Sequence, residues 1–164
     1  MPLYDKEKTL KFLDENNIKY EKIEHEAAFT MEELDKLGIT SKGLVVKNLF
    51  LRDAKGKIHY LISAPEERKI EMNMLAGKIG STRLSFASDE RLMKYLGVKQ
   101  GSVSPLGILN DENHEVIVVF DQALMGKDNI GVHPNENTAT CFISFKDLKS
   151  IVEKHGNKFL CVKL

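Results

Sequence analysis

Two apolar runs joined by a short turn constrain the fold of this chain more than any other feature of its sequence. Residues 43–53 and 57–64 are rich in β-branched and aromatic side chains, and Asp53-Ala54-Lys55-Gly56 between them has the composition of a hairpin turn. The centre of the first run, residues 45–51, is apolar at almost every position, so both faces of this strand should be covered. The sequence therefore predicts a β-hairpin that is packed on both sides.

Signals for further helices and strands follow one another with short connections and without repeats or linkers. Strands outnumber helices and hairpins outnumber crossovers, which favours an α/β (α+β) fold with a mixed, largely antiparallel, curved sheet and flanking helices around a pocket. A chain of 164 residues is expected to form a single domain, residues 1–164. Helices are predicted over residues 4–16, 30–38, 65–77, 88–97 and 145–155, and further strands over residues 19–25, 103–109, 115–120, 140–143 and 159–164.

The charge of the chain is balanced overall but unevenly distributed. Residues 42–100 contain twelve basic and six acidic side chains, whereas the segments before and after them are net acidic. The net charge of zero argues against a general nucleic-acid binder. The middle segment could still receive a polyanion, and the alternative is an ordinary solvated surface.

Other sequence features concern location and metal binding. No apolar stretch approaches the roughly 18 residues of a membrane span, and the lysine-containing N-terminus has no following apolar run, so we expect neither export nor a membrane anchor but a cytoplasmic protein. Cys141 and Cys161 lie in apolar runs without CxxC spacing and are expected to be core thiols. Metal-ligand spacing is absent among the scattered histidines, so no metal is predicted; they are His25, His59, His114 and His155.

Lys47 interrupts the apolar run of the first hairpin strand. It lies within Val45-Val46-Lys47-Asn48-Leu49-Phe50-Leu51, where a charged side chain is unexpected. A lysine at such a position either reaches solvent from the strand edge or projects into a cleft. In a cleft, its ammonium could hold a phosphate or polarise an ester carbonyl.

A second candidate is the loop Gly101-Ser102-Val103-Ser104-Pro105-Leu106-Gly107. Glycine allows the backbone to approach a ligand, and proline stiffens the loop, so that its N–H groups could face a developing oxyanion. The same pattern also occurs in ordinary turns. Because neither serine lies in a GxSxG motif, a serine nucleophile is disfavoured.

A third candidate is the polar segment of residues 131–140, which precedes a predicted buried strand. It contains His133, Asn137 and Thr138. Polar side chains at the mouth of a strand often line a pocket, although a histidine in a polar loop can also simply be exposed.

Together, these motifs resemble those of YbaK/ProX-type aminoacyl-tRNA editing domains over nearly the whole chain. The shared features are Lys47-Asn48-Leu49-Phe50-Leu51, the GxxxP loop of residues 101–105, and His133-Pro134 followed by residues 137–140, in the order and approximate separation of that family. The lysine followed by Asn-Leu-Phe-Leu and the late His-Pro-x-x-Asn-Thr-Ala-Thr motif are most similar to the free-standing, alanine-clearing members. Asn135 and Glu136 fall at variable positions of the late motif.

The resemblance implies a YbaK/ProX-like fold and hydrolysis of the ester that joins an amino acid to the terminal adenosine of a tRNA, without a cofactor. The expected substrate is alanine on tRNA for proline, cleared in trans, with cysteine as the alternative and prolyl-tRNA synthetase as a possible partner. The vicinal hydroxyl of the tRNA could help to activate the water. The resemblance assigns catalysis to Lys47 and Gly101, and substrate binding to Asn48, Ser102, Val103, Ser104, Pro105, His133, Asn137 and Thr138.

Two other functional classes remain open at this point. A catalytically silent module could keep the fold and dock a synthetase or a tRNA, although intact Lys47 and Gly101 count against this. A hydrolase of a small-molecule ester is the second alternative, for which zero net charge would be natural.

Overall fold

One mixed sheet organises the computed structural model, which describes residues 3–28 and 30–164. The strand order is β1-β7-β6-β2-β3-β5-β8, and β4 pairs with β2 outside this path. Four of the described strand pairings are antiparallel and three are parallel, which confirms the predicted mixed, mostly antiparallel sheet. The strands are β1 (Tyr20–Glu24), β2 (Leu44–Arg52), β3 (His59–Pro65), β4 (Ser85–Phe86), β5 (Val116–Asp121), β6 (Ile130–Val132), β7 (Ala139–Ile143) and β8 (Phe159–Val162).

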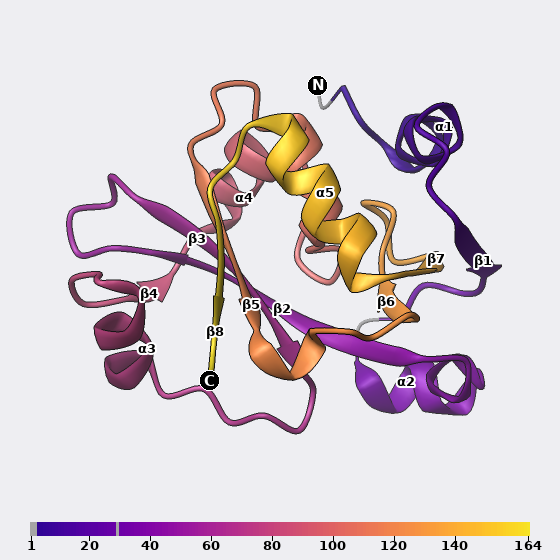
Figure 1. Ribbon diagram of the computed structural model, residues 1–164, viewed down its shortest axis with the longest axis horizontal. Coiled ribbons are helices and arrows are strands. Elements are labelled where there is room, and N and C mark those ends of the chain that lie inside the picture. The colour runs from indigo at the N-terminus through magenta and orange to yellow at the C-terminus, as the bar shows by residue number, and fades with distance from the viewer. Residues whose placement is uncertain (1–2, 29) are drawn as a thin grey trace.

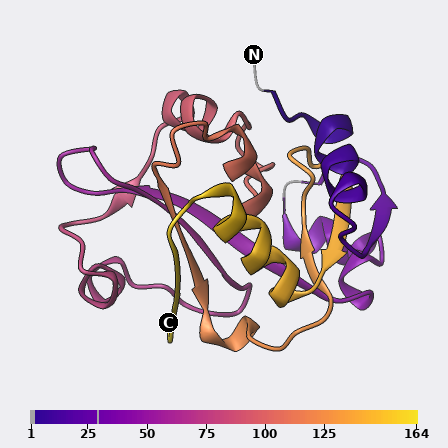
Figure 2. The same cartoon turned by 45° about the horizontal axis from the view of Figure 1, so that its top comes forward.

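Helices cover both faces and one end of this sheet (Figure 1). The larger hydrophobic cluster packs α4, η2 and α5 against one face, and a second cluster packs α3 against the other. Figure 2 shows α1 beside β1, while the β2–β3 hairpin extends away at the opposite end. The helices are α1 (Lys6–Glu15), α2 (Met31–Lys36), α3 (Met72–Ile79), α4 (Asp89–Leu96) and α5 (Phe145–His155), with 3-10 helices η1 (Ile39–Ser41), η2 (Pro105–Asn110) and η3 (Gln122–Leu124). Within residues 3–28 and 30–164, no helix has the length and apolar content to span a membrane.

The hairpin is confirmed, and both faces of its first strand are covered. Along β2, Val46 and Phe50 belong to the larger hydrophobic cluster, whereas Leu49 and Leu51 pack into the second one. Successive side chains of a strand point to opposite faces. This alternation therefore places Asn48 on the face of Val46 and Phe50, and Lys47 on the other face.

Two predicted elements are corrected by the structure. Residues 65–77 do not form one helix, because Pro65 is the last residue of β3 and the helix begins at Met72. The loop between them is held by Arg68, whose Nε donates to the buried Asp121 carboxylate at 2.9 Å. A proline restricts φ in a way that suits a strand end as well as a helix start, so the sequence alone does not separate the two.

The strand predicted over residues 103–109 is replaced in the structure by the 3-10 helix η2, Pro105–Asn110. Ser104 caps it, since its Oγ accepts a hydrogen bond from the N–H of Leu106 at 3.2 Å, and Pro105 occupies its first position. The residues from Pro105 to Leu109 are all buried. A short apolar run that is buried on every side has no clear periodicity, which explains the wrong prediction.

The short strand β6 was missed because its central residue is a glycine. A Cβ on Gly131 would lie 2.9 Å from atoms of both Phe142 and Val45, so the close packing here excludes a side chain.

The two cysteines differ from each other in burial. Cys141 is buried in the core as predicted, and burial raises the pKa of its thiol to about 12. Cys161 lies on β8 at the edge of the sheet and is only partly buried.

A buried histidine lies under the β2–β3 hairpin. His59 is 1% exposed and packs against the rings of Tyr95 and Phe50, at centroid distances of 4.1 and 5.5 Å. Its Nε2 is 2.9 Å from Nη1 of Arg91, which can only donate, so Nε2 is the acceptor and the imidazole is neutral. Burial, and then the Arg91 guanidinium, lower the pKa of His59 to about 4.

We expect His59 to make the folded protein less stable as the pH falls from about 6.5 to about 4. In this range the unfolded chain binds a proton at His59 and the folded protein does not, so the free energy of unfolding falls by at most ~1.4 kcal/mol per pH unit from this residue. A His59→Phe variant keeps the ring packing and removes the titration. Urea unfolding of both proteins at pH 7 and pH 5 checks this, and equal losses on acidification would contradict it.

Candidate functional site

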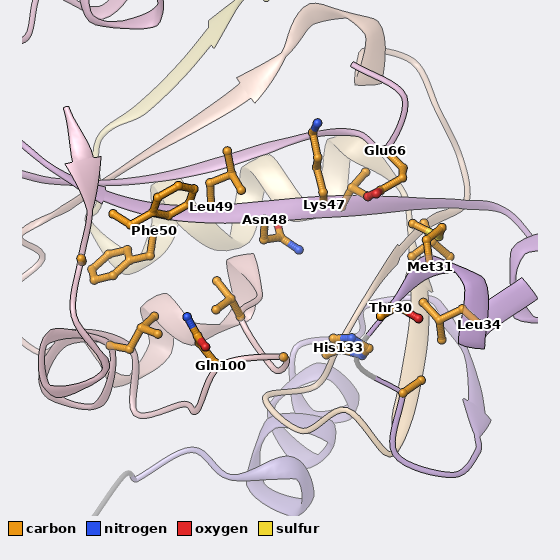
Figure 3. Close-up of a pocket in the computed structure, with 18 residues that line it drawn as sticks. Thr30, Met31, Leu34, Lys47, Asn48, Leu49, Phe50, Glu66, Gln100 and His133 are labelled. Atoms are coloured by element: carbon orange, nitrogen blue, oxygen red, sulfur yellow. The ribbon is translucent and has the colours of Figure 1, made fainter. Parts of the chain in front are cut away.

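A cavity of about 710 Å³ opens along β2, and five of the ten predicted site residues line it (Figure 3). Its walls come from four segments: Ala28, Thr30, Met31 and Leu34 before and within α2, residues 45–50 of β2, Phe86, Ala87 and Leu92 from β4 to α4, and Gln100, Gly101 and Val103. His133 and Glu66 complete the lining. This volume is in the usual range for a small-molecule binding site.

The cavity lies where the sheet is open. On the edge of β2 away from β3, pairing with β6 involves Leu44 and Val45, and pairing with β4 involves Leu51 and Arg52. No described strand pairs with this edge between those positions. Side chains from both faces of β2 can therefore reach one cavity around the exposed edge.

Lys47 reaches the cavity from one face of β2. Its side chain extends to the opposite side of the strand from that of Asn48 (Figure 3). The ammonium donates a hydrogen bond to the main-chain carbonyl of Arg68, in the loop that Asp121 holds. Glu66 of the same loop also lines the cavity, so this side carries both a cation and a carboxylate.

Asn48 reaches the cavity from the other face, toward Gln100 and His133 (Figure 3). Its Oδ1 accepts a hydrogen bond from the Ser63 hydroxyl of β3 at 2.5 Å. Ser63 itself is fully buried and was not identified in the sequence, where nothing distinguishes it from other strand serines.

Gly101 lines the cavity opposite β2 and adopts a φ of +88°. This left-handed conformation explains why the position is a glycine. Val103 also lines the cavity. The structure does not bring the other loop residues to the lining: Ser102 and Ser104 are buried, and Pro105 begins η2.

His133 presents a hydrogen-bond acceptor to the cavity. Its Nδ1 is 2.9 Å from the carbonyl of Ala139, and because a carbonyl only accepts, Nδ1 carries the proton and Nε2 is left as an acceptor. Burial, and to a smaller extent the neighbouring His25, lower the pKa of His133, while the bond to Ala139 opposes this shift. The imidazole is therefore neutral at physiological pH.

Asn137 and Thr138 lie behind the cavity wall rather than in the lining. The carbonyl of Asn137 accepts from the N–H of Ala28 at 3.2 Å, and that of Thr138 accepts from the N–H of His25 at 3.0 Å. These two bonds hold the segment before α2, and Ala28 of this segment lines the cavity.

Asn135 has a structural role that the sequence did not reveal. It is 5% exposed with a φ of +63°, a conformation that asparagine tolerates better than most residues. Its Nδ2 donates to the carbonyl of Tyr4 at 3.0 Å and to the Thr9 hydroxyl at 3.1 Å. These bonds attach the loop that carries His133 to the beginning of α1.

Within the described residues, no group of three or more His, Cys, Asp or Glu side chains is placed to hold a metal ion.

Comparison with known proteins relates this chain to one family. Residues 25–151 match the family model of the aminoacyl-tRNA editing domain, and this stretch contains every predicted site residue. The prolyl-tRNA editing protein ProX of Acetoanaerobium sticklandii is 49% identical over 164 residues, which cover the whole of both chains. The prolyl-tRNA synthetase associated domain-containing protein 1 of Bos taurus is 35% identical over 85% of this chain and 84% of its own.

Solved structures agree with the fold. A crystal structure described as a candidate trans-editing enzyme for prolyl tRNA synthetase superimposes with a TM-score of 0.70 over 99% of both chains. Its sequence identity of 20% makes this a likeness of fold alone.

Proposed function

This chain belongs to the aminoacyl-tRNA editing domain family, and we propose that it is an aminoacyl-tRNA deacylase that clears alanine from mischarged tRNA for proline in trans. The observation that carries the proposal is the cavity at the open edge of β2, which collects Lys47, Asn48, Gly101 and His133 from three separate motifs. The 49% identical relative, named a prolyl-tRNA editing protein, supports the assignment to tRNA for proline.

The chemistry requires few protein groups because the ester of an aminoacyl-tRNA is already activated. Water adds to the carbonyl carbon, the bond to the ribose oxygen breaks, and that oxygen takes the proton which the water loses. The enzyme then acts mainly by positioning the reactants and stabilising the developing oxyanion. The vicinal ribose hydroxyl can relay the proton. Among the described residues that line the cavity, the hydrogen bond of His133 goes to the Ala139 carbonyl and not to a carboxylate.

Each cavity residue has a proposed part in this reaction. The ammonium of Lys47 attracts the phosphate of the terminal nucleotide. The left-handed turn at Gly101 lets the main chain approach the reacting group, with the rest of the loop through Ser104 and Pro105 fixing its position. His133 accepts a hydrogen bond from the water or from the ammonium of the amino acid through Nε2.

The choice of alanine follows from steric selection. An editing enzyme must spare the correct product, and a pocket sized for a methyl group excludes the bulkier pyrrolidine ring of proline. The apolar wall formed by Ala28, Met31, Leu34 and Val45 suits such a side chain. Rejecting a larger group by shape is easier than rejecting a smaller one.

The proposal is tested by incubating the purified protein separately with alanyl-, cysteinyl- and prolyl-tRNA for proline and following release of each amino acid. We expect fast release of alanine and little release of proline. Fast release of cysteine alone would keep the deacylase and overturn the alanine assignment. A folded protein that releases none of the three would indicate the silent binding module, and equal hydrolysis of simple alanine esters would indicate a small-molecule hydrolase.

Recognition of the tRNA body is expected to depend on the basic middle segment, residues 42–100. Alanyl-tRNA for alanine carries the same ester and must survive, so alanyl-tRNA for proline should react faster. Raising salt from 50 to 200 mM should weaken tRNA binding about twenty- to fortyfold if three phosphates are contacted. Neutralising the exposed Lys55 and Lys57 should reduce this salt dependence, whereas Lys146→Gln on α5 should not. Salt-independent binding in a filter assay would contradict this role.

A further inference from the structure

Ser63 is a polar residue in a strand where every position is buried. Its side chain is 0% exposed, and its hydroxyl donates to Oδ1 of Asn48 at 2.5 Å. The two residues are direct partners in the β2–β3 register. Burying a hydroxyl costs hydration that only a hydrogen bond offsets, so the Asn48 carboxamide is what makes a serine tolerable here.

The direction of this hydrogen bond fixes the orientation of Asn48. Because the Ser63 hydroxyl occupies Oδ1, the amide nitrogen Nδ2 is turned away from β3. Figure 3 shows this nitrogen on the side of β2 that faces Gln100 and His133. Nδ2 carries two N–H donors and no acceptor. Asn48 therefore presents donors to the cavity.

The main chain of Asn48 faces the same opening. The N–H of Leu44 donates to the carbonyl of Asn129 and the carbonyl of Phe50 accepts from the N–H of Ala87, both at 2.9 Å. Alternate residues of a strand direct their main-chain groups to the same edge. Asn48 alternates with Leu44 and Phe50, so its main-chain groups point to the same edge of β2. At Asn48 this edge is unpaired, because it lies between the residues that pair with β6 and those that pair with β4. Its main-chain N–H adds a third donor beside Nδ2.

We propose that Ser63 is a positioning residue for deacylation, which holds the Asn48 carboxamide with its N–H donors toward the ester carbonyl. This inference rests on the proposed function. As water adds, the carbonyl oxygen becomes negative, and preorganised N–H donors stabilise that charge more than they stabilise the ground state. Without Ser63 the carboxamide can rotate and present Oδ1, which repels the oxyanion.

The inference separates the parts played by two adjacent residues. Lys47 lies on the other face of β2, where its ammonium contacts the Arg68 carbonyl near Glu66. That position suits a phosphate of the terminal nucleotide, whereas Asn48 lies on the side of Gly101 and His133. The donors for the oxyanion therefore come from Asn48.

A double-mutant cycle tests whether Ser63 acts through Asn48. Ser63→Ala should lower kcat for alanine release about tenfold with KM nearly unchanged, and Asn48→Ala should lower it about a hundredfold. The double variant should match Asn48→Ala alone, because Ser63 has nothing left to orient. Effects that multiply would overturn the inference. Ser81→Ala removes a buried hydroxyl that makes no hydrogen bond and should keep the parental kcat.

If Ser63→Ala does not fold, a second variant tests whether the N–H donors of the Asn48 carboxamide are needed for deacylation. Asn48→Asp keeps the bond from Ser63 and the side-chain volume, but it replaces the donors with a carboxylate oxygen. We expect kcat to fall more than about a hundredfold. A parental kcat in Asn48→Asp would overturn the inference.

A spectroscopic measurement keeps the inference separate from the proposed function. If the parent protein releases no amino acid from any tRNA, the proposed function fails, while the side-chain amide signals of Asn48 in a nitrogen-15 NMR spectrum still report its orientation. The parent should show two N–H signals displaced from the positions of a free asparagine side chain, and Ser63→Ala should shift both toward those positions as the carboxamide becomes free to rotate. Unchanged signals in a folded Ser63→Ala protein would overturn the positioning role.

Discussion

Replacing Lys47 by methionine is expected to lower kcat/KM for alanine release about a hundred- to a thousandfold, because the phosphate of the terminal nucleotide loses its cation, and to leave the protein folded. Lys47 provides a cationic side chain on its face of the cavity, where the described contact of its ammonium is a main-chain carbonyl rather than a counter-ion. Methionine has a similar length and flexibility and fills the same space without charge. The hydrophobic partners of β2 on both faces remain, so the strand should persist.

Single-turnover hydrolysis and a thermal melt of the same preparation check this expectation. Lys158→Met is a matched control, because that lysine is exposed and lies away from the cavity. It should release alanine at the parental rate. A folded Lys47→Met protein that hydrolyses within threefold of the parent would remove Lys47 from the site.

Gly101→Val is expected to reduce alanine release at least about a hundredfold while lowering the melting temperature by only a few degrees. Gly101 has a φ of +88°, a conformation that strains a β-branched residue by about 1 to 3 kcal/mol. The loop can relieve this strain only by moving, and it then no longer fits the reacting group across the cavity. Rate is therefore affected more than stability.

The chain contains a matched control for this strain. Gly126 has a φ of +74°, its added Cβ would meet nothing within 4 Å, and it is not part of the cavity lining. Gly126→Val should lower the melting temperature to a similar extent and keep parental kinetics. Parental kinetics in Gly101→Val as well would mean that the loop is a structural turn.

Much of the fold was predictable where local signals and burial agree. The hairpin of β2 and β3 has a turn and two continuous apolar runs, and α4 has Ser88 as its N-cap and Gly97 in a left-handed conformation at its end. Helix α5 was predicted with its observed bounds, Phe145–His155, because Ser144 and Gly156 mark both ends. The prediction failed for η2 and for the start of α3, where a proline or a fully buried apolar run is compatible with more than one element.

The site was predictable only in part because the cavity lies where the middle of β2 has no strand paired with its outer edge among the described residues. The motifs identified Lys47, Asn48, Gly101 and His133, which line one cavity. The opening between β6 and β4 exists because both strands are short, and neither has a strong sequence signal. Ser63 acts through a hydrogen bond to Asn48, and Asn135 acts through bonds to Tyr4 and Thr9. Such contacts between residues far apart in the chain leave no local pattern in one sequence.

The most direct test of the account is to locate where the aminoacyl end of a tRNA binds. A stable mimic, adenosine with alanine attached to its ribose through an amide, can be titrated into nitrogen-15-labelled protein. We expect the main-chain signals of Asn48, Gly101 and His133 to shift together and to saturate. A separate cavity of about 610 Å³ is lined by residues that include Tyr95 and Asn113. Signals that stay fixed at Asn48, Gly101 and His133 at saturation, or shifts confined to that separate cavity, would contradict the proposed site.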